Sequence, residues 1–183
     1  TIILLVANGE FKVRQQLLVQ VLCLLFPFQL RICEALVGLI SRTHFEQSDP
    51  ETLPIQLLQD PDNTSAKVLA HYGQMIMSHK FRRYDYGFLE NVRNYNSFTP
   101  PLYNLTKIKI PVYLIAGRGD ILARPENVIT LHKALSNEAN RFPIFFVDND
   151  KFTHMDFLWA KDVVPLCYEH VLNFINSNYH VLP

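Results

Sequence analysis

Short apolar runs alternate with amphipathic segments in the second half of the chain, and this alternation limits the fold more than any other feature. Residues 111–117 (PVYLIAG) and 142–147 (FPIFFV) have the length and apolar composition of buried β-strands. Residues 125–135 and 162–176 have apolar side chains at helical spacing. Strand, helix, strand and helix within about 65 residues predict a parallel sheet with crossover helices, and therefore an α/β fold class.

Polar residues follow both predicted strands. The first strand is followed by Arg118, Gly119 and Asp120, where Gly117 and Gly119 allow a sharp turn, and His154 follows the second strand, 34 residues after the aspartate. In open parallel sheets the chemistry lies beyond the carboxyl ends of the strands. A carboxylate there can fix the tautomer of an imidazole that takes a proton from a nucleophile. The spacing alone leaves open a turn aspartate and a surface histidine.

The first half of the chain has a different texture. Residues 1–7 predict a buried strand, residues 12–40 predict one or two very apolar helices, and residues 41–64 are polar and typical of a loop. Residues 65–80 predict an amphipathic helix capped by Ser65, with an apolar face that we expect to pack in the core. That face comprises Val68, Leu69, Tyr72, Met75 and Ile76.

Charge and hydropathy argue against nucleic-acid binding and against a membrane-spanning helix. The chain has 17 Lys+Arg and 17 Asp+Glu, so it lacks the positive charge expected of a nucleic-acid-binding protein. The longest apolar stretch, residues 17–28, is shorter than the about 20 residues that cross a bilayer. We expect this stretch to be buried, or alternatively to contact an acyl chain or a lipid interface. The sequence contains no cofactor or metal-binding motif, so we expect no cofactor.

Two sequons and three cysteines bear on the compartment. Asn63 and Asn104 each begin an Asn-x-Ser/Thr tripeptide and are candidate sites of N-glycosylation. Cys23 and Cys33 can form a disulfide in an oxidising compartment, which leaves Cys167 unpaired; three buried free thiols are the alternative.

A series of motifs extends from about residue 60 to residue 175. In chain order they are HYGQ (71–74), YDYG (84–87), PPLYNL (100–105), IPVYLI (110–115) with Gly117 and Asp120, and HMDFLWA (154–160). This series resembles the acid lipase family, which includes gastric and lysosomal acid lipases and their insect relatives.

The resemblance implies an α/β-hydrolase fold. Residues 1–8 would be a core strand, residues 9–100 a helical cap (lid), and residues 101–183 the C-terminal part of the core. It assigns Asp120 and His154 to the acid and the base of a Ser-His-Asp triad that cleaves acylglycerols or cholesteryl esters. The expected partners are a neutral lipid ester and a lipid interface reached through the cap. Together with the sequons, the resemblance favours a secreted or lysosomal protein.

The chain departs from the family at the nucleophile. No serine has glycine both two positions before and two positions after it, so the G-x-S-x-G elbow is absent, as is the family's His-Gly oxyanion segment. We therefore expect no esterase activity from this chain alone, with the serine supplied by sequence upstream of Thr1. One alternative is a non-catalytic lipid-binding or storage protein. Another is an inactive fragment, in which residues 1–7 form an apolar sheet edge without a neighbour.

Asp156 is a second carboxylate close to His154. Only two residues separate them, which places Asp156 poorly to reach the ring nitrogen that faces Asp120. We expect Asp156 to lie at a helix N-terminus, where a negative charge is favourable, or in an ion pair.

Overall fold

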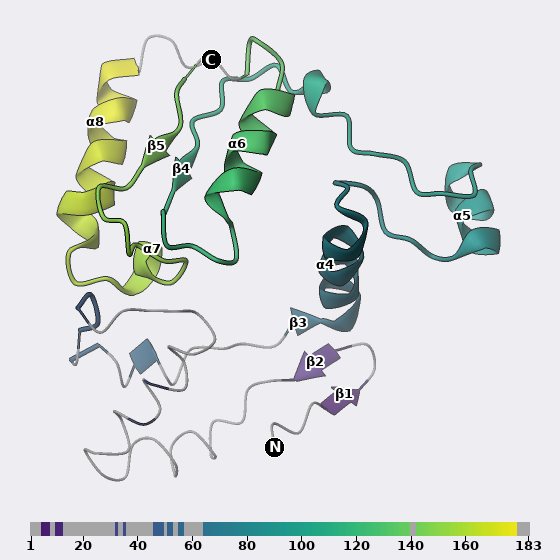
Figure 1. Cartoon of the computed structure of the whole chain (residues 1–183), viewed down its shortest axis with the longest axis horizontal. Helices are drawn as coiled ribbons and strands as arrows, with labels where there is room; N and C mark the ends of the chain where they lie inside the picture. The colour runs from purple at the N-terminus through teal and green to yellow at the C-terminus, as the bar shows by residue number, and fades with distance from the viewer. Residues whose placement is uncertain are drawn as a thin grey trace. The chain divides into compact units, whose positions relative to one another are not determined.

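A computed structural model describes residues 5–7, 10–12, 32, 35, 46–49, 51–52, 55–56, 64–139 and 142–178 (Figure 1). The chain divides into two units. The first comprises Thr1–Gln16 and Gln59–Asn104, and the second comprises Leu17–Leu58 and Leu105–Pro183. The domain boundaries predicted after residues 8 and 100 remain predictions.

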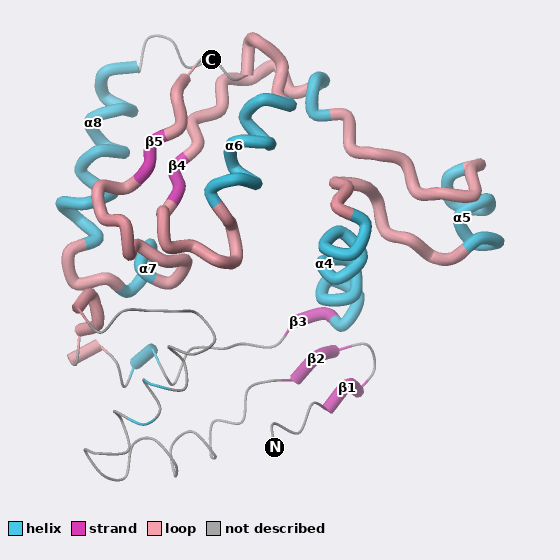
Figure 2. Tube along the Cα trace, in the orientation of Figure 1, coloured by secondary structure: helices cyan, strands magenta, loops and turns pink. Residues whose placement is uncertain are grey.

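The second unit contains the predicted parallel sheet. Strand β4 (Ile115–Ala116) pairs in parallel with β5 (Phe145–Phe146), and helix α6 (Pro125–Ala134) forms the crossover between them (Figure 2). Both strands are shorter than predicted, because beyond these two residue pairs the ladder continues only through single backbone bonds such as Val147 N to Ala116 O at 3.0 Å. This parallel pair with its crossover helix is compatible with a partial α/β fold, whereas the complete α/β-hydrolase fold and its cap remain predictions.

The chain after β5 packs the core of this unit. Helix α7 (Asp156–Trp159) is followed by a π-helical turn (Val164–Tyr168) and by α8 (Glu169–Asn178). The pattern of residues 162–176 predicts one continuous helix, whereas the structure has a π-helical turn before α8. Pro165 lies in this turn and has no N–H to donate to a regular α-helical hydrogen bond. The buried apolar cluster comprises Val147, Phe152, Ala160, Val163 and Cys167.

The first unit begins with antiparallel pairing. Strand β1 (Leu5–Ala7) pairs with β2 (Glu10–Lys12), which pairs with β3 (Thr64–Ser65). The prediction that the N-terminal strand has no neighbour is therefore wrong. Asn8-Gly9, the two residues between β1 and β2, is a strong signal for a tight β-hairpin, which the prediction of a single strand overlooks.

Helix α4 (Ala66–Ser78) confirms the predicted helix and its cap, since Ser65 Oγ accepts from Lys67 N at 3.2 Å. Its predicted apolar core face is not buried: Val68 is 59% exposed and Ile76 is 54% exposed. Helical spacing shows which side chains share a face, but it does not show whether another element covers that face.

The remaining described elements of the first unit are α5 (Phe88–Tyr95) and the irregular segments on either side of it; a short 3-10 helix (Leu105–Lys107) opens the second part of the second unit. Within the part of the chain that the structure describes, no helix is long and apolar enough to cross a membrane. The predicted apolar helices of residues 12–40, including the stretch 17–28, lie outside the described residues apart from Lys12, Ile32 and Ala35.

Candidate active site

The carboxylate of Asp120 is fixed just beyond the end of β4. The residue is 4% exposed. Its Oδ1 accepts from the backbone N–H groups of Leu122 and Ala123, both at 2.8 Å. These two bonds orient the carboxylate, so that Oδ2 remains for a partner on another loop.

That partner is the imidazole of His154, which follows β5. His154 Nδ1 lies 2.9 Å from Asp120 Oδ2. The side chain of His154 is 48% exposed, whereas that of Asp120 is 2% exposed. An ionised carboxylate only accepts hydrogen bonds, so the contact assigns the ring proton to Nδ1 and leaves the lone pair of Nε2 as a proton acceptor. The structure thus brings together the two residues that the sequence pattern placed at one edge of a parallel sheet.

Two glycines allow the loops that carry this pair to meet. A Cβ atom on Gly117 would lie 2.4 Å from the carbonyl oxygen of Phe152, and one on Gly119 would lie 2.9 Å from the carbonyl of Lys151. Gly119 N also donates to Phe152 O at 3.0 Å. The sequence pattern attributes these glycines to a sharp turn. The structure gives a further reason, because no side chain fits between the two backbones.

Asp156 binds the residue that precedes His154. Its Oδ2 accepts from the backbone N–H of Thr153 at 2.6 Å and from the Thr153 hydroxyl at 2.8 Å. The expected position at the start of a helix is confirmed, because Asp156 is the first residue of α7. Sequence reasoning missed the role of Thr153, although the T-x-x-D spacing of residues 153–156 is close to that of a capping box.

Comparisons with known proteins support a common origin with lipases. No protein-family model matches the chain. The chain is 30% identical to Lipase 1 of Drosophila melanogaster over 171 residues, which are 93% of this chain and 36% of that protein. It is 32% identical to Lipase 3 of Drosophila melanogaster over 80% of this chain and 36% of that protein. Gastric triacylglycerol lipase of Bos taurus is 28% identical over 79% of the chain and 35% of its own length.

The similarity to these lipases over most of the chain supports an acid lipase-like family. It spans about a third of the length of these relatives. Their names describe lipases, so lipase or ester-hydrolase activity is supported at the level of the family.

Of the other predicted sites, only some lie among the residues that the structure describes. Asn63, Cys23 and Cys33 lie outside the described residues. Asn104 is exposed, as an acceptor of a glycan must be. Cys167 is buried as a free thiol, and burial raises the pKa of that thiol.

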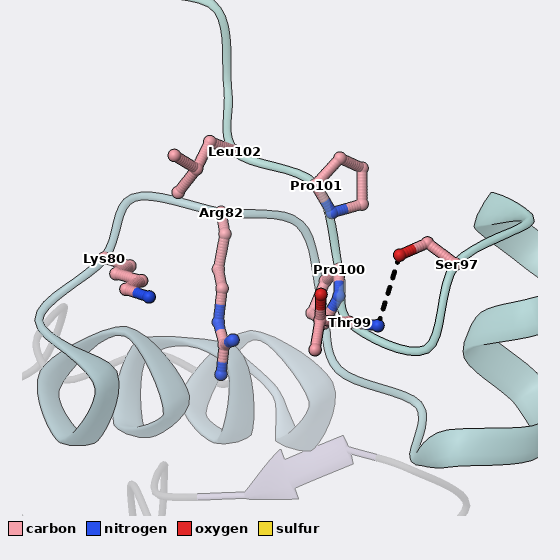
Figure 3. A pocket seen from close by; sticks show the side chains of 7 residues that line it. All are labelled: Lys80, Arg82, Ser97, Thr99, Pro100, Pro101 and Leu102. Carbon is pink, nitrogen blue, oxygen red and sulfur yellow. Dashed lines mark hydrogen bonds between the residues drawn. The ribbon is translucent and has the colours of Figure 1, made fainter.

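A cavity of about 300 Å³ lies in the first unit and was not predicted (Figure 3). It is lined by Lys80, Arg82, Ser97, Thr99, Pro100, Pro101 and Leu102. Arg82 Nε is buried there without a hydrogen-bond partner, while the guanidinium faces Asp85 at 3.6 Å. None of the predicted catalytic residues lines this cavity.

Proposed function

We propose that this chain is part of a lipase-type carboxylic ester hydrolase in which Asp120 and His154 are the acid and the base of a Ser-His-Asp triad. One observation carries the proposal: the 2.9 Å contact between His154 Nδ1 and the buried carboxylate of Asp120, at the ends of two parallel strands. The lipase names of the relatives and their similarity over most of this chain support it. The fold of the whole protein would then be an α/β-hydrolase core with a helical cap.

The geometry suits the roles of a hydrolase base. With its proton on Nδ1 bound to Asp120, the ring presents Nε2 to a serine hydroxyl and takes its proton as the serine oxygen attacks the ester carbonyl. The imidazolium then returns this proton to the departing alcohol, which leaves an acyl-enzyme. In the second half of the cycle Nε2 takes a proton from water, whose oxygen attacks the acyl carbon. The imidazolium then returns this proton to the serine oxygen, which leaves as the free hydroxyl while the carboxylic acid is released. Asp120 stabilises the imidazolium in both halves.

The serine and the oxyanion donors are proposed to lie outside these 183 residues, because no G-x-S-x-G occurs within them. The substrate class we propose is a neutral lipid ester, an acylglycerol or a cholesteryl ester. The name triacylglycerol lipase of one relative supports this class. A secreted or lysosomal location completes the proposal, and the exposure of Asn104 supports it.

The open reading frame upstream of Thr1 provides the first test, since it must encode a G-x-S-x-G motif. The second test uses the full-length product, with a fluorophosphonate label for the nucleophile and turnover of a short-chain ester. We expect His154→Ala and Asp120→Asn to lower kcat by about 10⁴-fold, as losses of triad members do.

His132→Gln is a matched control, because this histidine also belongs to the second unit but binds the backbone carbonyl of Phe142. It should change turnover by less than about twofold, because it removes no triad group. Binding of lipid without any turnover would contradict the proposal and favour the non-catalytic lipid-binding alternative.

A further inference from the structure

A buried acidic side chain closes a ring of bonds around His154. Thr153 is fully buried and Asp156 is 4% exposed. One carboxylate oxygen of Asp156 accepts two bonds from Thr153, one from the backbone N–H and one from the hydroxyl. His154 and Met155 lie between these two residues in the chain, so the hydrogen-bonded loop from Thr153 to Asp156 includes the backbone of His154.

A carboxylate is costly to bury, and this one is compensated by hydrogen bonds to the loop. The bond from the backbone N–H of Thr153 is 2.6 Å long and the bond from its hydroxyl is 2.8 Å long. A surface turn could use a solvated aspartate at much lower cost. The burial therefore indicates that this loop requires a defined conformation.

Backbone hydrogen bonds also hold the residues on either side of His154. Before Thr153, the carbonyl of Phe152 accepts from Gly119 N at 3.0 Å, which joins the His154 loop to the Asp120 loop. After His154, the carbonyl of Met155 accepts from Leu158 N and from Trp159 N, both at 3.0 Å. The backbone of His154 is thus held from each end.

The position of the backbone matters because the imidazole of His154 is half exposed. A side chain that is 48% exposed is weakly restrained by packing, so the position of its Cα largely decides which atoms the ring can reach. We infer that Asp156 is a positioning residue: through Thr153 it fixes the loop on which His154 Nδ1 meets Asp120 Oδ2, and it does not itself touch the reacting atoms. This inference rests on the proposed function of the same pair.

The test uses three variants of the full-length protein. Asp156→Asn keeps the shape but removes the charge, Thr153→Val removes the hydroxyl, and Thr153→Ser retains it as the conservative rescue. We expect kcat to fall about 10- to 100-fold in the first two variants while KM changes by less than about twofold, because small displacements of a catalytic group cost this much. Thr153→Ser should keep kcat within about threefold of the wild type.

A second measurement does not depend on activity. Nitrogen NMR of histidine-labelled protein reports which ring nitrogen of His154 carries the proton, with His154→Ala used to assign the signal. The wild type should show the Nδ1–H form, because the bond to Asp120 selects it. Asp156→Asn and Thr153→Val should lose that form in part, and Thr153→Ser should retain it.

Leu135→Ala is the control for simple destabilisation, since Leu135 is buried in the same unit but lies outside the cluster that contains Phe152. It should lower the unfolding temperature without altering kcat or the His154 tautomer. If Asp156→Asn and Thr153→Val leave the tautomer unchanged and lose no more kcat than Leu135→Ala, the inference is overturned.

The two proposals fail in different ways. Turnover that survives His154→Ala would overturn the proposed triad. Turnover abolished by His154→Ala but unaffected by Asp156→Asn would overturn the positioning role alone. If the full-length protein cleaves no ester, the tautomer measurement still tests the positioning role. A smaller share of the Nδ1–H form in Asp156→Asn and Thr153→Val supports that role, and an unchanged share overturns it.

Discussion

The two units of the chain are stabilised by different kinds of interaction. In the second unit, Val147, Phe152 and their neighbours form a buried apolar cluster that supports the loops after β4 and β5. In the first unit, none of the Ala, Leu, Val or Phe side chains of residues 64–104 is buried, and the one fully buried large side chain in this range is Asn91. Polar side chains supply the buried contacts described below for residues 74–98 of this unit.

The segment between α4 and α5 shows how this works. Gln74 donates to Asp85 O at 2.9 Å and accepts from Asp85 N at 2.8 Å. Asn91 accepts from Tyr86 N and donates to Phe98 O and to Asp85 Oδ1. A segment without a strand ladder or helix must find partners for its backbone groups, and here side chains of the two helices supply those of Asp85 and Tyr86. The first unit should therefore be sensitive to the loss of single polar groups, and the second to changes of volume.

The largest expected effect is that of Gly117→Ala in the second unit. Its new Cβ would lie 2.4 Å from the carbonyl oxygen of Phe152, a backbone atom that cannot move alone. We expect a loss of about 3 kcal/mol in the free energy of unfolding, the upper range for overpacking. The displaced loops should also lower the turnover of the full-length protein by about 100-fold. Urea titration and ester kinetics measure the two effects.

Gly73→Ala is the matched control. Gly73 lies inside α4 and nothing lies within 4 Å of the Cβ position. Alanine should stabilise the helix there by about 0.5–1 kcal/mol. A Gly117→Ala variant that unfolds at the same urea concentration as the wild type would refute the close-packing constraint between the two loops.

These two glycines also show what the sequence could predict. The pairing of β4 with β5 and the crossover helix α6 follow from periodicity. The rule that parallel strands end at one edge places Asp120 and His154 at the same edge, but their pairing is predicted only by the resemblance to acid lipases. The contact of Gly117 with Phe152 does not follow, because it depends on the distance between two loops that are remote in sequence.

The first unit was harder to predict for a related reason. Its bonds between side chains and backbone, such as those of Gln74 with Asp85, join residues that share no periodic pattern. The exposed face of α4 has the spacing of a core helix, and only the three-dimensional structure shows that Val68 and Ile76 are exposed. The pairing of β1 with β2 could have been predicted from Asn8-Gly9.

Asn91→Ala should have the next largest effect, this time in the first unit. Removing the amide leaves Tyr86 N and Phe98 O without their partners in a site where the side chain is 1% exposed. We expect a loss of about 2 kcal/mol in stability. Hydrogen exchange of peptides from residues 81–98 measures it. Asn94→Ala, at an exposed position of the same helix, is the control and should leave this exchange unchanged.

A smaller effect is expected from acid. The hydrogen bond from the Asn91 side chain and then that from the backbone of Gly87 lower the pKa of Asp85. A carboxyl with a lowered folded-state pKa stabilises the protein fully above its unfolded pKa of about 3.9, and this contribution is lost as the pH falls through the folded pKa. The rate of hydrogen exchange in residues 81–98, after correction for the intrinsic rate at each pH, should therefore rise as the pH falls below about 4. Asp85→Asn should flatten this dependence; an equally steep curve in that variant would assign the acid sensitivity to other groups.

The smallest expected effect is on the labelling rate of Cys167 by a thiol reagent. This rate tests whether the two units unfold separately. Cys167 is 3% exposed, and desolvation raises its thiol pKa, so the native thiol should react slowly at pH 8. The difference between the wild type and Cys167→Ser isolates its labelling from that of the other cysteines. Gly117→Ala should accelerate this labelling, because it destabilises the unit in which Cys167 is buried, whereas Asn91→Ala should leave it unchanged. If Asn91→Ala accelerates labelling of Cys167 as much as Gly117→Ala does, the two units unfold together. The hydrogen bonds of Asn91 and the apolar cluster around Cys167 then belong to one cooperative unit.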